Sequence, residues 1–204
     1  MTGIKNIIFD LGGVLLNIDF SKSIEAFEKL GIENFEHMFS QTIADELFKS
    51  LETGDMGEAG FYTAIKKRTT IGVTDGDIAD AWNALILNFR TQSLETLEKL
   101  SAKYKLFLLS NTNSIHHTCF QKILTEETGK PSLDNYFSKA WYSHKLGLRK
   151  PGAAIYEYVL KDGNLLAAET LFIDDTWANI ETAQSLGFKT HHLKPTEKIE
   201  NILE

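Results

Sequence analysis

The stretch IIFDLGGVLLNID at residues 7–19 decides how the rest of the sequence is interpreted. Its first residues are apolar without alternating polar side chains, which is typical of a strand buried on both faces of a sheet. Asp10 then falls at the carboxyl end of this strand, and Gly12 and Gly13 let the backbone turn sharply and approach a ligand. Ligands of open α/β sheets bind outside the carboxyl ends of the strands. The stretch therefore fits either an ordinary strand and turn or one wall of a ligand site.

Length and composition limit the classes of protein to consider. The 204 residues are enough for one large domain, or for one domain with an insertion. The net charge of −7 argues against a nucleic-acid partner, and the single cysteine, Cys119, excludes an intramolecular disulfide. No stretch has the length and hydrophobicity of a membrane span, and the N-terminus lacks a signal-peptide pattern. We therefore expect a cytoplasmic protein without a membrane partner.

Helical patterns follow the first strand and continue to about residue 104. Gly31 is predicted to end the first helix, and Thr74 or Asp75 to cap the fourth, with Trp82, Leu85 and Phe89 on one face. A further helix is predicted to begin after Arg90. The aromatic stripes favour the packing of a small helical bundle over a cofactor site. The apolar stripes lie at residues 24–30, 35–51, 61–65 and 78–89.

The remainder of the sequence alternates between strand and helix patterns. Pro151 is predicted in the first turn of its helix, where a missing N–H is harmless. This alternation predicts a parallel sheet covered by helices on both faces. The helical run at roughly residues 17–90 is then a second, all-α unit inserted after the first strand. Strands are predicted at residues 106–109, 140–142, 171–173 and 190–193, and helices at 151–160 and 178–186.

Polar residues at four places carry the candidate chemistry, because a parallel sheet brings its strand ends together. Asp10 and Asp175 can share a divalent cation such as Mg²⁺, which prefers oxygen ligands. Lys150 can offset the charge of carboxylates and of a phosphoryl group, and Ser110 can donate a hydrogen bond to phosphoryl oxygens. The Asp10 carboxylate can also act as a nucleophile. Each residue alone has an ordinary explanation as a turn or helix cap, but their order along the chain favours one site.

These residues stand in four motifs that together resemble a known superfamily. The motifs are IIFDLGGVL around Asp10, LLSNTN around Ser110, LGLRKPGAAIY around Lys150, and LFIDDTWANIETAQSLG around Asp174 and Asp175. The set resembles the haloacid dehalogenase superfamily of aspartate-nucleophile hydrolases. Within it the sequence is most similar to bacterial sugar-phosphate phosphatases such as α-D-glucose-1-phosphate phosphatase.

The resemblance implies a fold, a cofactor and a division of the chain. The expected fold is α/β, with a Rossmann-like parallel-sheet core formed by residues 1–16 and 91–204. Residues 17–90 are expected to form an inserted all-α cap that closes over Asp10 as a lid. Loop residues near the first joint, Asn17 and Asp19, are then expected near the substrate. The implied cofactor is Mg²⁺, and the implied partner is a small phosphorylated metabolite.

The resemblance also implies roles for single residues. Asp10 is expected to be the nucleophile, with Ser110 and Lys150 as further catalytic residues. Asp174 is expected to point toward Lys150, and Asn179 to support the site. The expected phosphate contacts come from Ser110, Asn111, Lys150 and Gly12, and the expected metal ligands are the Asp10 carboxylate, the Gly12 carbonyl and the Asp175 carboxylate.

Gly12 is a departure from most phosphatases of this superfamily, which carry there an aspartate that protonates the leaving group. Such a group is typically worth about 10²–10⁴-fold in rate. Without it, esters with more acidic leaving groups should react best, which predicts a preference for sugar 1-phosphates. Three functions therefore stay open. They are a Mg²⁺-dependent phosphatase, a dehalogenase in which Asp10 attacks carbon, and a nearly inactive protein that binds a phosphorylated ligand or a partner.

Overall fold

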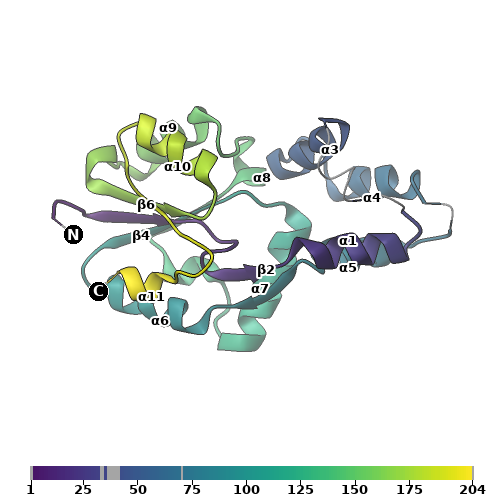
Figure 1. The fold of residues 1–204 in the computed structure, drawn as a ribbon, viewed down its shortest axis with the longest axis horizontal. Coiled ribbons are helices and arrows are strands. Elements are labelled where there is room, and N and C mark those ends of the chain that lie inside the picture. Colours follow the sequence, from purple (N-terminus) through teal and green to yellow (C-terminus); the bar gives the residue numbers. More distant parts are fainter. Residues whose placement is uncertain (1, 33–34, 36–41, 70, 204) are drawn as a thin grey trace.

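The apolar run before Asp10 forms β1, the central strand of the main sheet (Figure 1). The computed structural model describes residues 2–32, 35, 42–69 and 71–203, and within them five parallel strands pair in the order β5–β4–β1–β6–β7. The predicted α/β fold with a parallel sheet is confirmed. The strands are β1 (Asn6–Phe9), β4 (Lys105–Ser110), β5 (Lys139–Tyr142), β6 (Thr170–Asp174) and β7 (Lys189–His192).

Each face of the sheet carries its own apolar layer, because successive side chains of a strand point to opposite faces. Ile7 and Phe9 pack with side chains of α6, α7 and α11 on one face, and Ile8 packs with those of α9 and α10 on the other (Figure 1). Among the described residues, no helix is both long and apolar enough to cross a bilayer. The covering helices are α6 (Thr91–Leu100), α7 (Ser114–Thr128), α9 (Ala153–Gly163), α10 (Trp177–Ser185) and α11 (Ile199–Ile202).

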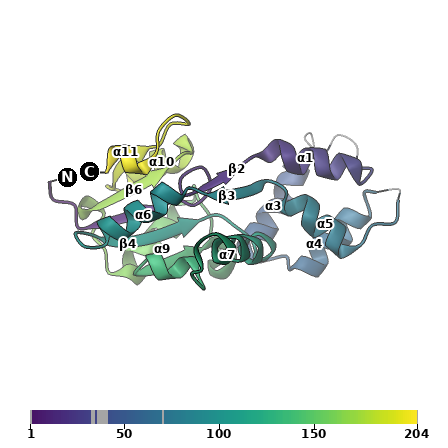
Figure 2. The same ribbon diagram turned by 90° about the horizontal axis from the view of Figure 1, so that it is seen from below.

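A group of helices extends to one side of the sheet and has its own apolar cluster (Figures 1 and 2). The ring of Trp82 stacks on Phe48 with centroids 4.9 Å apart, and Phe27 stacks on Phe35 at 4.1 Å. These contacts agree with the predicted bundle packing, whereas the cap boundaries at residues 17 and 90 stay a prediction. Part of the predicted stripe, residues 36–41, lies outside the described residues. The helices are α1 (Phe20–Lys29), α3 (Thr42–Thr53), α4 (Glu58–Lys66) and α5 (Asp75–Asn83).

The prediction that only helices follow the first strand up to about residue 104 is wrong. Thr74 caps α5 as predicted, but α5 ends at Asn83, and Phe89 belongs to a strand. This strand, β3 (Ile86–Phe89), pairs antiparallel with β2 (Leu16–Ile18), so a two-stranded ribbon joins the helices to the sheet (Figure 2). The spacing of Leu85 and Phe89 fits one face of a helix, and only the pairing with a distant segment makes this stretch extended.

The helix predicted from Pro151 begins two residues later. Gly152 is the N-cap, and α9 starts at Ala153. The segment before it is fixed by the Asn111 side chain, which accepts from the Lys150 N–H at 2.9 Å and donates to the Lys150 carbonyl at 2.9 Å. The backbone of Lys150 therefore bonds to a neighbouring strand end instead of joining the helix.

Candidate active site

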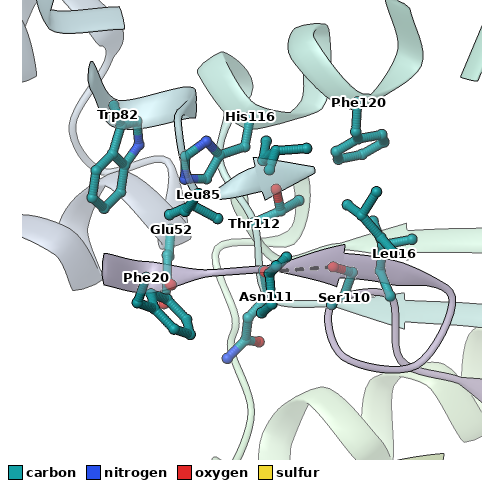
Figure 3. A pocket seen from close by; sticks show the side chains of 14 residues that line it. Leu16, Phe20, Glu52, Trp82, Leu85, Ser110, Asn111, Thr112, His116 and Phe120 are labelled. Atoms are coloured by element: carbon teal, nitrogen blue, oxygen red, sulfur yellow. Dashed lines mark hydrogen bonds between the residues drawn. The ribbon is translucent and has the colours of Figure 1, made fainter. Parts of the chain in front are cut away.

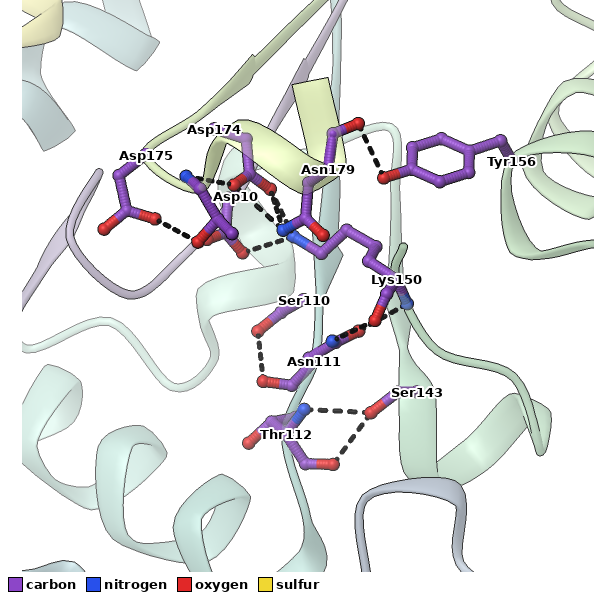
Figure 4. A network of polar contacts seen from close by, with 11 residues as sticks. Asp10, Ser110, Asn111, Thr112, Ser143, Lys150, Tyr156, Asp174, Asp175 and Asn179 are labelled. Atoms are coloured by element: carbon purple, nitrogen blue, oxygen red, sulfur yellow. Dashed lines mark hydrogen bonds and ion pairs between the residues drawn. The ribbon is translucent and has the colours of Figure 1, made fainter. Parts of the chain in front are cut away.

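The four predicted polar sites meet at one edge of the sheet, as Figure 4 shows. Asp10 directly follows β1, Ser110 is the last residue of β4, and Asp174 is the last residue of β6. These strands are parallel neighbours, so their carboxyl ends lie side by side. Lys150 reaches them from the loop between the short helix α8 (Ser143–Leu146) and α9.

Lys150 is the buried centre of this group. Its ammonium Nζ lies 2.7 Å from Asp10 Oδ1 and 2.7 Å from Asp174 Oδ2, and its side chain is only 1% exposed. Burial acts to lower the pKa of Lys150, but the two carboxylates reverse this effect and raise it above its ordinary value. Burial also raises the pKa of the Asp10 carboxyl to about 7; Lys150 opposes this shift, and the charge of Asp174 adds to it.

Both carboxylate oxygens of Asp174 are engaged in hydrogen bonds. Oδ2 binds Lys150, the Asn179 amide donates to both oxygens at 3.0 Å, and the Thr176 N–H donates to Oδ1 at 2.8 Å. Asn179 stands on α10, whose position is fixed in turn by the Tyr156 hydroxyl donating to the Asn179 carbonyl at 3.0 Å. The structure thus directs Asp174 toward Lys150 and places Asn179 behind it, and the supporting roles of the two residues stay predictions.

Asp175 completes an acidic cluster beside the glycine turn. One oxygen each from Asp10, Asp174 and Asp175 lie within 4.8 Å of one another. Gly13 has a φ of +71°, and a Cβ added to it would stand 2.1 Å from Asp175 Oδ2. The lack of a side chain at Gly13 therefore leaves room for the Asp175 carboxylate. The sequence predicted only a sharp turn and the close approach of a ligand there. Three carboxylates facing one ammonium leave an excess of negative charge, and an all-oxygen donor set of this kind suits a hard cation such as Mg²⁺.

Ser110 and Asn111 lie at the end of β4, next to Lys150. The buried Ser110 hydroxyl is 3.4 Å from the Asn111 carbonyl, and the Asn111 side chain holds the Lys150 backbone as described above. Ser143, which the sequence analysis missed, exchanges two hydrogen bonds of 2.9 Å with the backbone of Thr112. Such a buried serine has no recognisable sequence signal. Phosphate binding by Ser110 and Asn111 stays a prediction.

An open cleft of about 340 Å³ adjoins Asp10, Lys150 and Asp175. Its walls include Glu52 of α3 and Arg149, which the sequence analysis did not single out; Arg149 Nε lies 2.8 Å from Glu52 Oε2. This ion pair joins residues 97 positions apart, so no local pattern indicates it. The helices that extend from the sheet thereby contribute to the same cleft as the strand ends.

The expectation that Asn17 and Asp19 approach the substrate stays a prediction, and both side chains contact other residues of the chain. Asn17 Oδ1 accepts from Arg90 Nε at 2.9 Å, and Asp19 caps α1 by accepting from the Ser21 N–H. Side chains alternate along extended backbone, so the neighbouring residues Ile18 and Phe20 line the cleft instead.

Gly12 also lines the cleft, but the space beside it is limited. A Cβ added to Gly12 would lie 3.1 Å from the Cδ1 atom of Ile18. The place where an acidic side chain would begin is therefore bounded by an apolar side chain of β2. Metal coordination by the Gly12 carbonyl stays a prediction.

Several known proteins are similar to this chain in sequence and in structure. A family model described as haloacid dehalogenase-like hydrolase matches residues 4–187. A D-ribitol-5-phosphate phosphatase from Bacteroides thetaiotaomicron is 33% identical over 189 residues, which cover 92% of this chain and 90% of the relative. A crystal structure of a haloacid dehalogenase family enzyme from that organism matches all of both chains, with 36% identity and a TM-score of 0.93. Another, in complex with magnesium and inorganic phosphate, covers 98% of this chain and 100% of its own, with 35% identity and a TM-score of 0.88.

Proposed function

The chain belongs to the haloacid dehalogenase-like hydrolase family, and from this we propose that it is a Mg²⁺-dependent phosphatase of small phosphorylated metabolites. We place sugar phosphates and sugar-alcohol phosphates first among its substrates. The activity named for the relative, a D-ribitol-5-phosphate phosphatase, supports this class. The magnesium and phosphate bound to a similar structure support the cofactor and the type of group transferred.

The observation that carries the proposal is the position of Asp10. Its carboxylate is held by the buried ammonium of Lys150 at 2.7 Å and borders an open cleft, so one oxygen is fixed while the cleft gives room for a substrate. A carboxylate in this position can attack the phosphorus of a phosphomonoester. The P–O bond to the leaving group breaks, the leaving oxygen takes a proton from water, and an acyl phosphate forms on Asp10. Water then attacks this phosphate, which regenerates Asp10 and releases inorganic phosphate.

The remaining residues of the site neutralise negative charge or hold other side chains in position. Lys150 offsets the negative charge of Asp10 and of the incoming phosphoryl group, while the Ser110 hydroxyl donates a hydrogen bond to a phosphoryl oxygen. The Asp10 and Asp175 carboxylates, with the Gly12 carbonyl, would hold Mg²⁺. The bound ion would neutralise charge on the phosphoryl oxygens. Asp174 and Asn179 keep Lys150 in place.

We propose a cytoplasmic location and a free metabolite as the partner, with no role for nucleic acid or a membrane. The net charge of −7 supports this, because a nucleic-acid partner would favour a basic surface. The two cations that line the cleft, Lys150 and Arg149, are each paired with a carboxylate of the site.

A phosphate-release assay with a panel of phosphorylated metabolites tests the proposal. We expect turnover with Mg²⁺, loss of turnover with EDTA, and a fall below a few per cent of the original rate for Asp10→Asn while the fold stays intact. Asp134→Asn, at an acidic residue outside the cleft lining, is the matched control and should retain activity.

Two further measurements separate the alternatives. Chloride release from 2-haloacids without Mg²⁺ would indicate the dehalogenase. Calorimetric binding of a phosphorylated metabolite without any turnover would indicate the nearly inactive binding protein. Full activity of Asp10→Asn would reject Asp10 as the nucleophile.

A further inference from the structure

A second, smaller cavity opens beside the cleft, on the side of the ribbon and of α7 (Figure 3). It measures about 120 Å³ and shares Gly12, Ile18 and Phe20 with the cleft that borders Asp10. The cavity and the cleft beside Asp10 are therefore adjacent. The leaving group of the substrate can extend into the cavity.

The cavity limits the size of that leaving group. An engineered cavity of about 150 Å³ in another protein binds benzene, so a cavity of about 120 Å³ accepts a chain or ring of roughly five carbon atoms. Its lining is mainly apolar, and the carbon skeleton would pack against side chains of the ribbon and α7. The apolar lining includes Leu16, Ile18, Leu85, Ile86 and Phe120.

His116 is the imidazole in this lining, and its orientation is fixed. The ring stacks on Trp82 with centroids 4.7 Å apart at an interplanar angle of 18°, and Figure 3 shows it between Trp82 and the cavity. His116 Nδ1 lies 2.9 Å from Asn83 Oδ1. A carbonyl oxygen can only accept, so Nδ1 carries the proton of the neutral ring and Nε2 presents a lone pair. Burial lowers the pKa of His116 to about 3, which keeps the ring neutral.

The Nε2 atom is the one polar ring atom of His116 that no other described residue engages, since the hydrogen bond to Asn83 uses Nδ1. A lone pair in the wall of a mainly apolar cavity, whose other polar lining residues are Glu52, Ser110, Asn111 and Thr112, rewards a ligand that brings a hydroxyl donor to it. An alkyl chain of the same length leaves that lone pair without a partner, and this costs free energy.

We propose that His116 is a specificity-determining residue, whose Nε2 accepts a hydrogen bond from a hydroxyl of a leaving group of about five carbon atoms. The proposal rests on the proposed phosphatase function and names the substrate class more closely. Among esters whose leaving groups are equally acidic, the favoured substrates are phosphate esters of short polyols or of small sugars. Phosphates of long or purely aliphatic alcohols are poor substrates, because they exceed the cavity or lack the donor.

The test compares ribitol 5-phosphate with n-pentyl phosphate, which has the same chain length and no free hydroxyl. His116→Phe keeps an aromatic ring against Trp82 and removes both nitrogen atoms. We expect kcat/KM for ribitol 5-phosphate to fall about tenfold, the worth of one hydrogen bond, and kcat/KM for n-pentyl phosphate to change less than twofold. His117→Phe is the matched control, because His117 packs against Tyr142 outside the cavity lining and should not alter the ratio.

Two further measurements keep the proposal falsifiable if His116→Phe does not fold. Asn83→Leu releases Nδ1 and should lower the same preference for ribitol 5-phosphate. Nitrogen NMR of the imidazole rings should show Nε2 of His116 unprotonated near neutral pH. An equal loss for both esters, an unchanged preference in either variant, or a protonated Nε2 would overturn the proposal. Absence of phosphate release from every ester by the unaltered protein would instead reject the phosphatase function itself.

Discussion

Gly12 and Gly13 are adjacent in sequence, but a different neighbour limits the space for a side chain at each of them. Gly13 has a left-handed backbone conformation, and any side chain there would overlap the Asp175 carboxylate. Gly12 has space for a Cβ only if Ile18 yields by a few tenths of an ångström. Most phosphatases of the superfamily carry a general acid at this position. Here the space for a side chain is limited by Ile18 but not fully occupied.

Restoring an acid at this position tests the leaving-group explanation. The unaltered protein should prefer glucose 1-phosphate to glucose 6-phosphate, because the anomeric hydroxyl is the better leaving group. Gly12→Asp combined with Ile18→Val, which makes room, should raise kcat/KM for the 6-phosphate more than for the 1-phosphate. The upper limit is about 10²–10⁴-fold.

Gly12→Asn in the same background is the matched control, since it has the same shape and no acidic proton. A selective gain with Asn, or an equal change for both esters with Asp, would contradict a role in proton transfer. An initial preference for the 6-phosphate would contradict the leaving-group argument directly.

At the scale of elements, the sequence predicts the main sheet well and the ribbon poorly. β1, β4 and β6 are buried on both faces, so their apolar runs are visible without knowledge of their partners. β2 and β3 are short and include polar residues, and their identity depends on pairing across about 70 residues. The strand-end residues were predictable for the same reason as the strands, whereas Glu52 and Arg149 meet only through the folded arrangement.

We predict that the Glu52–Arg149 ion pair helps the helices to hold the substrate in the cleft. It connects α3 to the loop beside Lys150, and Gly54 lies so close to the His144 carbonyl that a Cβ would approach it to 2.4 Å. If residues 17–90 move as a lid, Glu52→Gln should weaken the closed state and raise KM about two- to fivefold, as expected for one partly exposed ion pair.

A double-mutant cycle of Glu52→Gln and Arg149→Met measures the coupling in KM. Asp75→Asn removes an ion pair with Lys66 that stays within the helices, so it should leave KM unchanged. Additive effects of the two cleft variants would show that the pair does not hold the closed state.

At the scale of the whole molecule, burial of neutral histidine makes stability depend on pH. The pKa of His116 falls from 6.5 in the unfolded chain to about 3, so between these values the unfolded chain binds more protons than the folded one. Stability from this residue is therefore full above about pH 7 and is lost as the pH falls.

His116→Phe should remove this dependence. Relative to the variant, the unaltered protein should lose about 2 kcal/mol of unfolding free energy between pH 8 and pH 5. Urea unfolding of both proteins at the two pH values measures the difference, in which shared contributions such as the raised pKa of Asp10 cancel. Parallel pH curves would show that His116 titrates normally.

The charged residues and part of the cavity lining lie on different elements, so mutations can change one without the other. Asp10 and Asp174 stand at the ends of strands and Lys150 on the loop before α9, whereas Ile18 and Ile86, on the ribbon, line the neighbouring cavity. A mutation in the ribbon can alter the shape of the cavity while the charged group stays intact. Under the proposed function, a lineage can therefore exchange one alcohol for another through changes in the ribbon.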